Sequence, residues 1–120
     1  MAKYVDGFVI PIPKKNLAKY RKIARIGCKV WMKHGALDYY ECAGDDIKNS
    51  HCGLGFPKMC KLKPSETVVF AFIVYKNKAH RNKVNKKVVK EMGDIGGEWA
   101  MPFDMKRFVF GGFKVIVEAK

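Results

Sequence analysis

Four stretches of the chain have the residue pattern of β-strands, either rich in β-branched and aromatic residues or alternating with a period of two. Residues 4–12 form the first stretch, and residues 37–43 alternate in the second. Residues 67–75 are an uninterrupted apolar run, which predicts a central strand buried on both faces. Residues 107–118 predict a last strand, with a bulge at its central pair of glycines.

Two further stretches have the apolar spacing of three or four residues that is typical of an amphipathic helix. Residues 16–33 predict a long first helix that ends near Gly35, with one apolar face formed by Leu17, Tyr20, Ala24, Cys28 and Trp31. The second helix follows Asn77, which can cap its amino terminus, and ends at Gly93. One face of this helix carries His80, Val84, Val88 and either Glu91 or Met92.

The connections between these elements are rich in glycine and polar residues. Residues 45–57 form the longest irregular segment, and such loops often carry function because a rigid scaffold presents them. Residues 56–63 predict a short edge strand. Residues 96–104 predict a turn-rich connection to the last strand.

The predicted order of elements is β-α-β-β-α-β within a single domain, residues 1–120. With right-handed crossovers, this order gives a ferredoxin-like α+β fold, in which an antiparallel four-stranded sheet carries two helices on one face. The other face of the sheet is then apolar and uncovered, which would leave a large adhesive patch on a monomer. A homodimer is the simplest way to cover this face.

Basic residues dominate the charge of the chain, because 24 Lys and Arg stand against 11 Asp and Glu and give a net charge of +13. A charge of this size attracts polyanions. The lysines on the outer faces of the two predicted helices form either a solvated surface or an anion-attracting stripe. Residues 107–113 partly match the basic, aromatic and glycine signature of the RNA-recognition module, but on the last strand instead of the third. Nucleic acid is therefore an alternative partner.

The sequence has neither a signal-peptide pattern at its amino terminus nor an apolar run long enough to span a bilayer. We therefore expect a cytoplasmic protein with no membrane contact. Its four cysteines, Cys28, Cys42, Cys52 and Cys60, are then expected to be reduced. They form no C-x-x-C pair, and His51 with Cys52 and Cys60 is only a weak ligand cluster, so no metal site is expected.

Several short motifs occur together along almost the whole chain. They are Tyr4-Val5-Asp6-Gly7-Phe8-Val9, His34-Gly35-Ala36-Leu37, Glu41-Cys42 with Gly44-Asp45-Asp46, Ala79-His80-Arg81, Met101-Pro102-Phe103-Asp104 and Gly111-Gly112-Phe113-Lys114. In this combination the chain resembles the YbaA-like bacterial proteins, a domain of unknown function (DUF1428). The resemblance implies a dimeric α/β barrel, in which two ferredoxin-like sheets face each other as in small monooxygenases and haem-degrading enzymes. It implies no particular reaction, because one fold hosts many.

Four ionisable residues at predicted inward positions are the candidate catalytic groups, namely Asp6, His34, Glu41 and His80. Asp6 lies within an apolar strand, so it needs a partner such as Arg107 or a functional reason to be there. His34 ends the first helix, where it either interacts with the helix dipole or forms an acid–base pair with Glu41. His80 is either a satisfied core residue or a general base, or else a metal or haem ligand.

The candidate ligand-binding residues are Tyr39, Arg81, Asp104 and Arg107. The chain contains no phosphate-binding Gly-rich loop, no H-E-x-x-H and no G-x-S-x-G, so nucleotide, zinc-protease and hydrolase chemistry are disfavoured. No cofactor is expected, although haem or a metal ion stays an alternative. We therefore expect a dimer with an unknown small-molecule ligand, acting as a binding module or as a cofactor-free enzyme of the oxygenase or isomerase type. A basic nucleic-acid-associated protein is the alternative.

Overall fold

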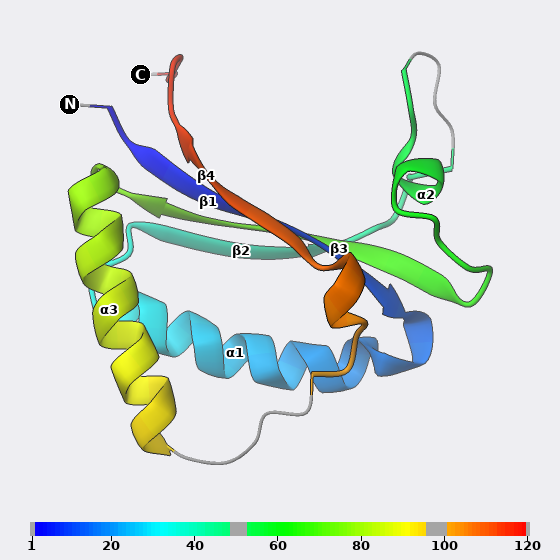
Figure 1. Cartoon of the computed structure of the whole chain (residues 1–120), viewed down its shortest axis with the longest axis horizontal. Coiled ribbons are helices and arrows are strands. Elements are labelled where there is room, and N and C mark those ends of the chain that lie inside the picture. The colour runs from blue at the N-terminus through cyan, green and yellow to red at the C-terminus, as the bar shows by residue number, and fades with distance from the viewer. Residues whose placement is uncertain (1, 49–52, 96–100, 120) are drawn as a thin grey trace.

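The computed structural model describes residues 2–48, 53–95 and 101–119 of the chain, in which one layer of strands lies above two long helices (Figure 1). Along the chain the elements are β1 (Tyr4–Pro13), η1 (Lys14–Asn16), α1 (Leu17–Lys33), β2 (Asp38–Ala43), α2 (Phe56–Met59), β3 (Glu66–Tyr75), α3 (Lys78–Ile95), η2 (Met105–Arg107) and β4 (Val109–Lys114). The predicted α+β class, with an antiparallel sheet, is confirmed.

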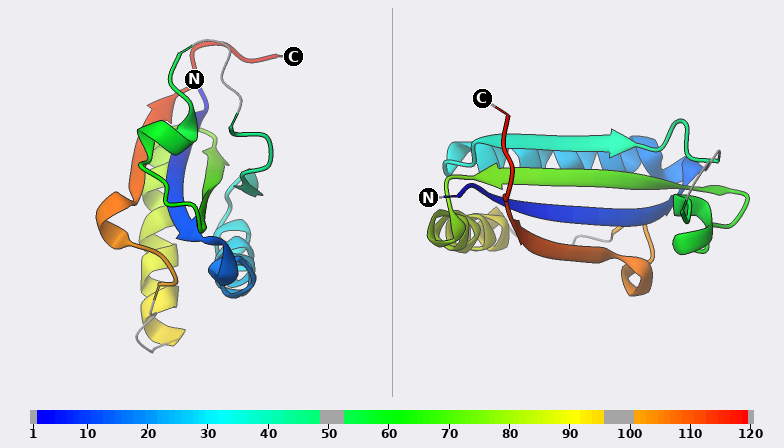
Figure 2. Two further views of the ribbon diagram at one scale, coloured as in Figure 1. Left: turned by 90° about the vertical axis from the view of Figure 1, so that its right-hand side faces the viewer. Right: turned by 90° about the horizontal axis from the view of Figure 1, so that it is seen from above.

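The strands form a four-stranded sheet in the order β2-β3-β1-β4, and each neighbouring pair is antiparallel. Seen from above the sheet, the strands follow this order with α1 and α3 beneath them (Figure 2). The two central strands, β1 and β3, pair along their whole length. Both long helices therefore cover the same face of the sheet, and the opposite face carries no long helix.

The core lies between the sheet and the two long helices, because every second strand residue points toward them. One cluster of buried side chains lies near α3 and comprises Val30, Ala36, Ile73, Tyr75, Val84 and Val88. A second cluster lies nearer the start of α1 and comprises Ile10, Ile12, Val69 and Ala71. The predicted inward positions Val84 and Val88 are thus confirmed, since each is 1% exposed.

The predicted bulge at Gly111 and Gly112 is wrong. β4 pairs with β1 without interruption, and Gly112 lies directly opposite Asp6. A Cβ atom at Gly112 would lie 2.4 Å from the hydroxyl oxygen of Tyr4 and 2.9 Å from a terminal nitrogen of Arg81. Glycine therefore occurs here because other side chains approach the backbone closely, rather than because the strand is irregular.

Three other elements differ from the prediction, and the first is the last strand, because β4 comprises Val109–Lys114 instead of residues 107–118. Residues 56–59 form the short helix α2 instead of an edge strand, with Pro57 in its first turn, where a missing N–H costs nothing. α3 continues past Gly93 to Ile95, while its predicted cap is confirmed, since the Asn77 side chain accepts from the His80 N–H at 2.8 Å. The predicted glycine-rich turn at residues 96–97 lies outside the described residues.

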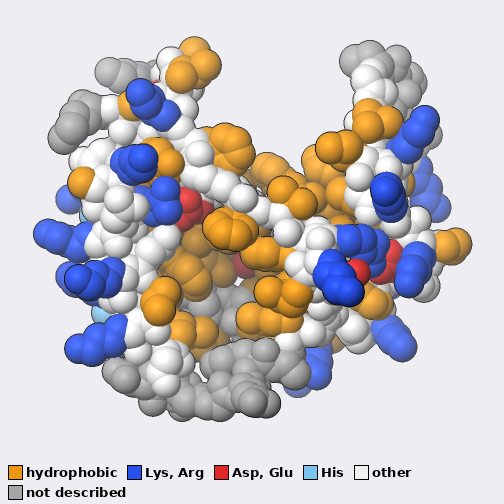
Figure 3. Space-filling view, viewed as in Figure 1, with side chains coloured by type: hydrophobic (Ala, Val, Ile, Leu, Met, Phe, Trp, Pro, Cys, Tyr) orange, Lys and Arg blue, Asp and Glu red, His pale blue; other side chains and the backbone are white. Residues whose placement is uncertain are grey.

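The face of the sheet away from α1 and α3, which we call the open face, exposes apolar side chains on all four strands. Tyr40, Phe70, Val109 and Phe113 are 45–61% exposed, so the prediction that the central strand is buried on both faces is wrong for the single chain. The register places these residues beside Val5, Gly7, Val9 and Phe72. Figure 3 shows the sheet along its edge: hydrophobic side chains border the notch above the strands, on the side of the open face, and also the recess between the strands and the helices, while most lysines and arginines lie around the outside.

Within the described residues, no helix is both long and apolar enough to cross a membrane.

Candidate functional site

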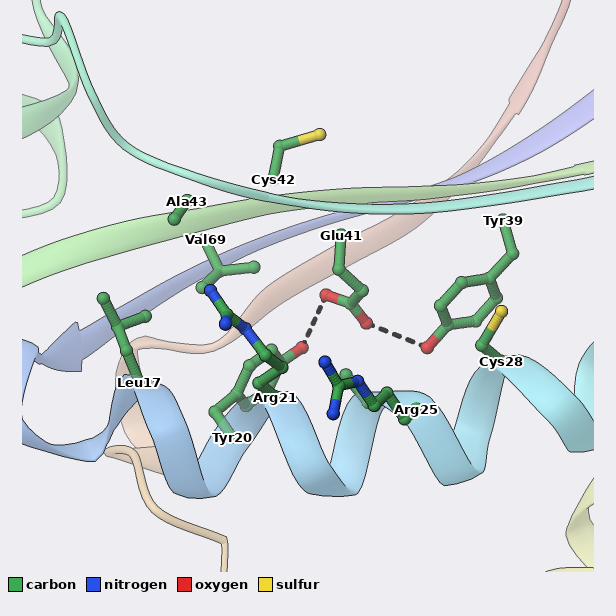
Figure 4. Close-up of a pocket in the computed structure, with 11 residues that line it drawn as sticks. Leu17, Tyr20, Arg21, Arg25, Cys28, Tyr39, Glu41, Cys42, Ala43 and Val69 are labelled. Atoms are coloured by element: carbon green, nitrogen blue, oxygen red, sulfur yellow. Dashed lines mark hydrogen bonds between the residues drawn. The ribbon is translucent and has the colours of Figure 1, made fainter.

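The most distinctive polar group between the sheet and the helices is Glu41. The alternation along β2 turns Glu41 and Tyr39 toward α1, while Tyr40 and Cys42 face the opposite way. Tyr20 reaches the same carboxyl group from α1 (Figure 4). The Tyr20 hydroxyl donates to Glu41 Oε2 at 2.8 Å, and the Tyr39 hydroxyl donates to Glu41 Oε1 at 2.9 Å.

The environment of this cluster determines which of its groups can accept a proton. Burial raises the pKa of the Glu41 carboxyl, and the hydrogen bonds from Tyr20 and Tyr39 lower it again in part. Burial, reinforced by the neighbouring Glu41 charge, raises the pKa of both tyrosine hydroxyls far above their usual range. The phenols therefore remain hydrogen-bond donors, and Glu41, with its raised pKa, is the proton acceptor of this cluster.

Two cavities meet at this cluster. The first, of about 300 Å³, lies between α1 and β2, and its polar lining includes Arg21, Arg25 and Cys28. The second, of about 210 Å³, lies deeper between the sheet and the helices and is lined by apolar side chains that include Phe8, Ile10, Trp31, Met92, Phe103 and Phe108. Glu41, Tyr20 and Tyr39 line both cavities. The carboxyl group therefore lies where a polar opening joins an apolar interior.

Asp6, another predicted catalytic residue, belongs to a separate buried network. Its side chain accepts from Asn85 Nδ2 at 3.2 Å and lies 3.7 Å from Arg81 Nε. The predicted pairing of Asp6 with Arg107 is wrong, because Arg81 on α3 is the cation that reaches β1. Asp6 is only 5% exposed, so this ion pair provides the compensation that a buried carboxylate requires.

Asn85 connects this network to the rest of the core. Its Oδ1 atom accepts from Trp31 Nε1 and from the Tyr75 hydroxyl, each at 3.0 Å. Arg81 additionally donates to the Tyr4 hydroxyl at 3.2 Å and lies over the Tyr4 ring, 4.9 Å from its centre. Nearly every polar atom here has a partner within the protein, which is the pattern of a structural network.

The two histidines lie apart from Glu41 and have partners of their own. The predicted acid–base pair of His34 with Glu41 is wrong, because His34 Nε2 lies 2.7 Å from Glu91, which also binds Lys33. His80 Nδ1 accepts from the backbone N–H of Lys76 at 3.0 Å. Burial and the neighbouring lysines lower the pKa of His80, so this histidine is neutral at pH 7.

The remaining predicted ligand-binding residues, Asp104 and Arg107, form a surface clasp. Arg107 holds both carboxylate oxygens of Glu66 and also pairs with Asp104 at 3.2 Å. The hydrogen bonds from Arg107 and from the Lys63 backbone lower the pKa of Glu66 to about 2. This clasp ties η2 to the start of β3 and lines neither of the two cavities.

No group of three or more His, Cys, Asp or Glu side chains within residues 2–48, 53–95 and 101–119 is arranged to hold a metal ion. The weak ligand cluster predicted from His51 and Cys52 lies outside the described residues. Cys28, Cys42 and Cys60 are free thiols, as predicted for these three. His80 is the other candidate haem or metal ligand suggested by the sequence, and its Nδ1 atom already accepts a hydrogen bond from a backbone N–H.

Glu41 and Tyr39 were predicted from the sequence, but their partner Tyr20 was not, although a tyrosine on the inward face of a helix needs an acceptor for its hydroxyl. It also missed Arg21 and Arg25, which lie one helical turn apart beside the inward face of α1. Their spacing of four residues was the available signal.

The described residues thus define an α+β protein with an antiparallel sheet, two long helices on one face and a half-buried carboxyl group between two cavities. The chain belongs to the family described as "Protein of unknown function (DUF1428)", whose model matches residues 3–105. It is 35% identical over 118 residues to the "Uncharacterized protein YbaA" of Escherichia coli, an alignment that covers 97% of this chain and 98% of that protein. The protein of the same name from Shigella flexneri matches with the same identity and coverage.

Solved structures add little to this assignment. The de novo designed protein Foldit4 aligns over 97% of this chain and 99% of its own, with 8% sequence identity and a TM-score of 0.44, a likeness too weak to bear on the fold. The family and its named relatives have no stated activity, so membership in the family assigns no reaction to the Glu41 cluster.

Proposed function

We propose that the protein is a homodimer of ferredoxin-like chains, a dimeric α/β barrel, that binds a small molecule in the cavities between its sheet and helices. Glu41 is the group that meets the ligand, and Tyr20 and Tyr39 hold its carboxylate in place. One observation carries this proposal: a half-buried carboxyl group, fixed by two phenols, lies where an open cavity joins an apolar one.

The strand order supports the ferredoxin-like part of the proposal. Read from the other edge, the order is β4-β1-β3-β2 with all pairs antiparallel, which is the arrangement expected when two β-α-β units interleave. Both helical crossovers, α1 and α3, lie on one side of the sheet (Figure 2).

A second copy of the chain is the occupant that best fits the open face. The strand residues of this face include Tyr40, Phe70, Val109 and Phe113, and an apolar surface of this extent is unusual on a monomer. In the described strands no lysine or arginine points from this face, so two copies can approach without bringing their positive charges together. Ile116 and Val117, 90% and 86% exposed, extend beyond the same face and add apolar surface for a partner copy.

The chemistry of the site favours a ligand that donates a proton or a hydrogen bond to Glu41. The carboxylate has acceptor capacity beyond the two phenol hydrogen bonds, and the apolar cavity beside it excludes competing water. Because its pKa is raised, Glu41 is a stronger base than an exposed glutamate. As an enzyme, the protein would therefore be of the cofactor-free isomerase or oxygenase type, with Glu41 removing a proton from an activated C–H or O–H group.

A nucleic-acid partner remains the other candidate from the charge of +13. The exposed aromatic side chains on which bases could stack include Tyr40 and Phe70 of the open face. A dimer would cover these side chains, whereas base stacking requires them to be exposed. The two functions therefore exclude each other on this surface. The dimer test described below therefore distinguishes them as well.

The proposed function is tested by a fragment screen at pH 7, read by thermal shift and by ligand-observed NMR, on the wild type and on Glu41→Gln. Fragments that carry an O–H or N–H donor are expected to bind the wild type at least about tenfold more tightly than the variant, since a hydrogen bond to a charged group contributes about 1.5–3 kcal/mol. Purely apolar fragments should bind both proteins equally. The proposal would be overturned if the wild type bound no fragment, or if donor-carrying fragments bound Glu41→Gln as tightly as the wild type.

A further inference from the structure

The wall of the larger cavity carries two positive charges for which the described part of the chain provides no carboxylate partner. Arg21 and Arg25 lie one turn apart on α1 and both line this cavity. Figure 4 shows their guanidinium groups rising from the helix into the space between α1 and β2, on the side of Glu41. Among the hydrogen bonds and ion pairs of the described residues, none involves either guanidinium group.

The other exposed cations of the chain differ from this pair. Lys33 and Arg107 have carboxylate partners, and Lys19 and Lys22 lie on the outer part of α1 away from both cavities. Arg21 and Arg25 instead share a cavity wall with the half-buried carboxyl group of Glu41 and two hydroxyl groups. A pair of guanidinium groups presents several N–H donors in fixed geometry, which matches the oxygens of a carboxylate or a phosphate.

We infer that the ligand of the proposed site is a small organic anion, whose carboxylate or phosphate is held by Arg21 and Arg25 while its uncharged body reaches Glu41 and the apolar cavity behind it. This inference rests on the proposed function and narrows it to a ligand class. The order of groups along the cavity requires such a molecule: two cations stand at the opening, the acceptor Glu41 follows, and an apolar lining lies beyond. The two cations also outweigh the single carboxylate, so an anion is attracted to the opening.

A matched set of variants tests the inference. Arg21→Gln and Arg25→Gln remove the charges at the mouth, and Lys19→Gln and Lys22→Gln remove the same number of charges from the outer part of the same helix. The probes are 4-hydroxybenzoate, its neutral analogue 4-hydroxybenzamide, and phenyl phosphate, and binding is measured by isothermal titration calorimetry at fixed salt. Inorganic phosphate carries the anionic group without an organic body, so its affinity measures how strongly the anionic group binds on its own.

The wild type is expected to bind the carboxylate or the phosphate at least tenfold more tightly than the amide. Each arginine substitution should weaken the binding of the anions about tenfold, whereas the lysine substitutions should change it less than about twofold, because Lys19 and Lys22 do not line the cavity and solvent screens their charges from a ligand inside it. The amide should bind all variants alike.

Failure of the inference and failure of the proposed function give different results. If the amide and the anions bind equally and in a Glu41-dependent manner, or if the arginine and lysine variants weaken binding alike, the cavity is a ligand site but not an anion site. If no probe and no fragment binds the wild type, the proposed function is wrong and the inference is wrong with it.

Discussion

Substitution of Val109 by aspartate should break the dimer while leaving the single chain folded. Val109 lies on β4, pairs with Val9 and is 60% exposed on the open face. Complete burial of a valine side chain contributes about 1.5–3 kcal/mol, so covering this exposed fraction contributes about 1–2 kcal/mol in each copy. A two-fold dimer contains the substitution twice, which gives a loss of about 2–4 kcal/mol and an increase of at least roughly 30-fold in the dimer dissociation constant.

Val89→Asp is the matched control, because Val89 is 71% exposed on α3, away from the open face. Sedimentation velocity over a range of protein concentrations measures the dissociation constant, and circular dichroism checks the fold of each variant. The wild type and Val89→Asp should sediment as dimers where Val109→Asp is a monomer. A wild type that stays monomeric at every concentration, or two aspartate variants with the same dissociation constant, would refute the reasoning and leave the open face available to nucleic acid.

Three further predictions concern the stability of the single chain. Because the pKa of Glu66 is lowered to about 2, its pairing with Arg107 should contribute stability above pH 4.5 that is lost as the pH falls toward 2. Glu66→Gln should lower the free energy of unfolding by about 1 kcal/mol at pH 7, because solvent screens an ion pair at the surface, and urea unfolding at several pH values should show the difference shrinking in acid; a pH-independent difference would contradict it. Gly112→Ala should cost about 1–3 kcal/mol because its Cβ would overlap the Tyr4 hydroxyl, whereas Gly111→Ala, with its nearest neighbour at 3.7 Å, should cost clearly less. Glu41→Gln should raise the melting temperature at neutral pH, because burial raises the pKa of Glu41 and the charged form therefore lowers the stability of the fold. This gain in melting temperature should vanish near pH 4. A gain that persisted in acid would show that the charge of Glu41 is not its cause.

The order of elements could be predicted from the sequence because it depends on local periodicity. The alternation over residues 37–43 and the uninterrupted run over residues 67–75 identify β2 and β3, and the spacing of Val84 and Val88 identifies the inward face of α3. The predictions were wrong where contacts between residues far apart in the sequence determine the structure. The glycine at position 112 follows from the approach of the Tyr4 hydroxyl from the paired strand, which no local pattern reveals.

The candidate site could be predicted only in part, for the same reason. Glu41 stands out because a carboxylate on the inward side of a strand requires an explanation. Its partner Tyr20 is 21 residues away in sequence, and His34 pairs with Glu91 at a separation of 57 residues. Such pairings depend on which turn of which helix packs against the strand, so sequence could name the ionisable groups but could not pair them.

Binding of a small molecule in the cavities beside Glu41 is tested most directly by filling them. Ala24 lines both cavities, whereas Ala18 is exposed on the same helix, so Ala24→Leu and Ala18→Leu add the same atoms inside and outside the site. The measurement is the dissociation constant of a fragment that binds the wild type, determined by calorimetry for both variants at matched stability. Loss of binding in Ala24→Leu with unchanged binding in Ala18→Leu is the predicted result, and equal binding by both variants would contradict a ligand site at Glu41.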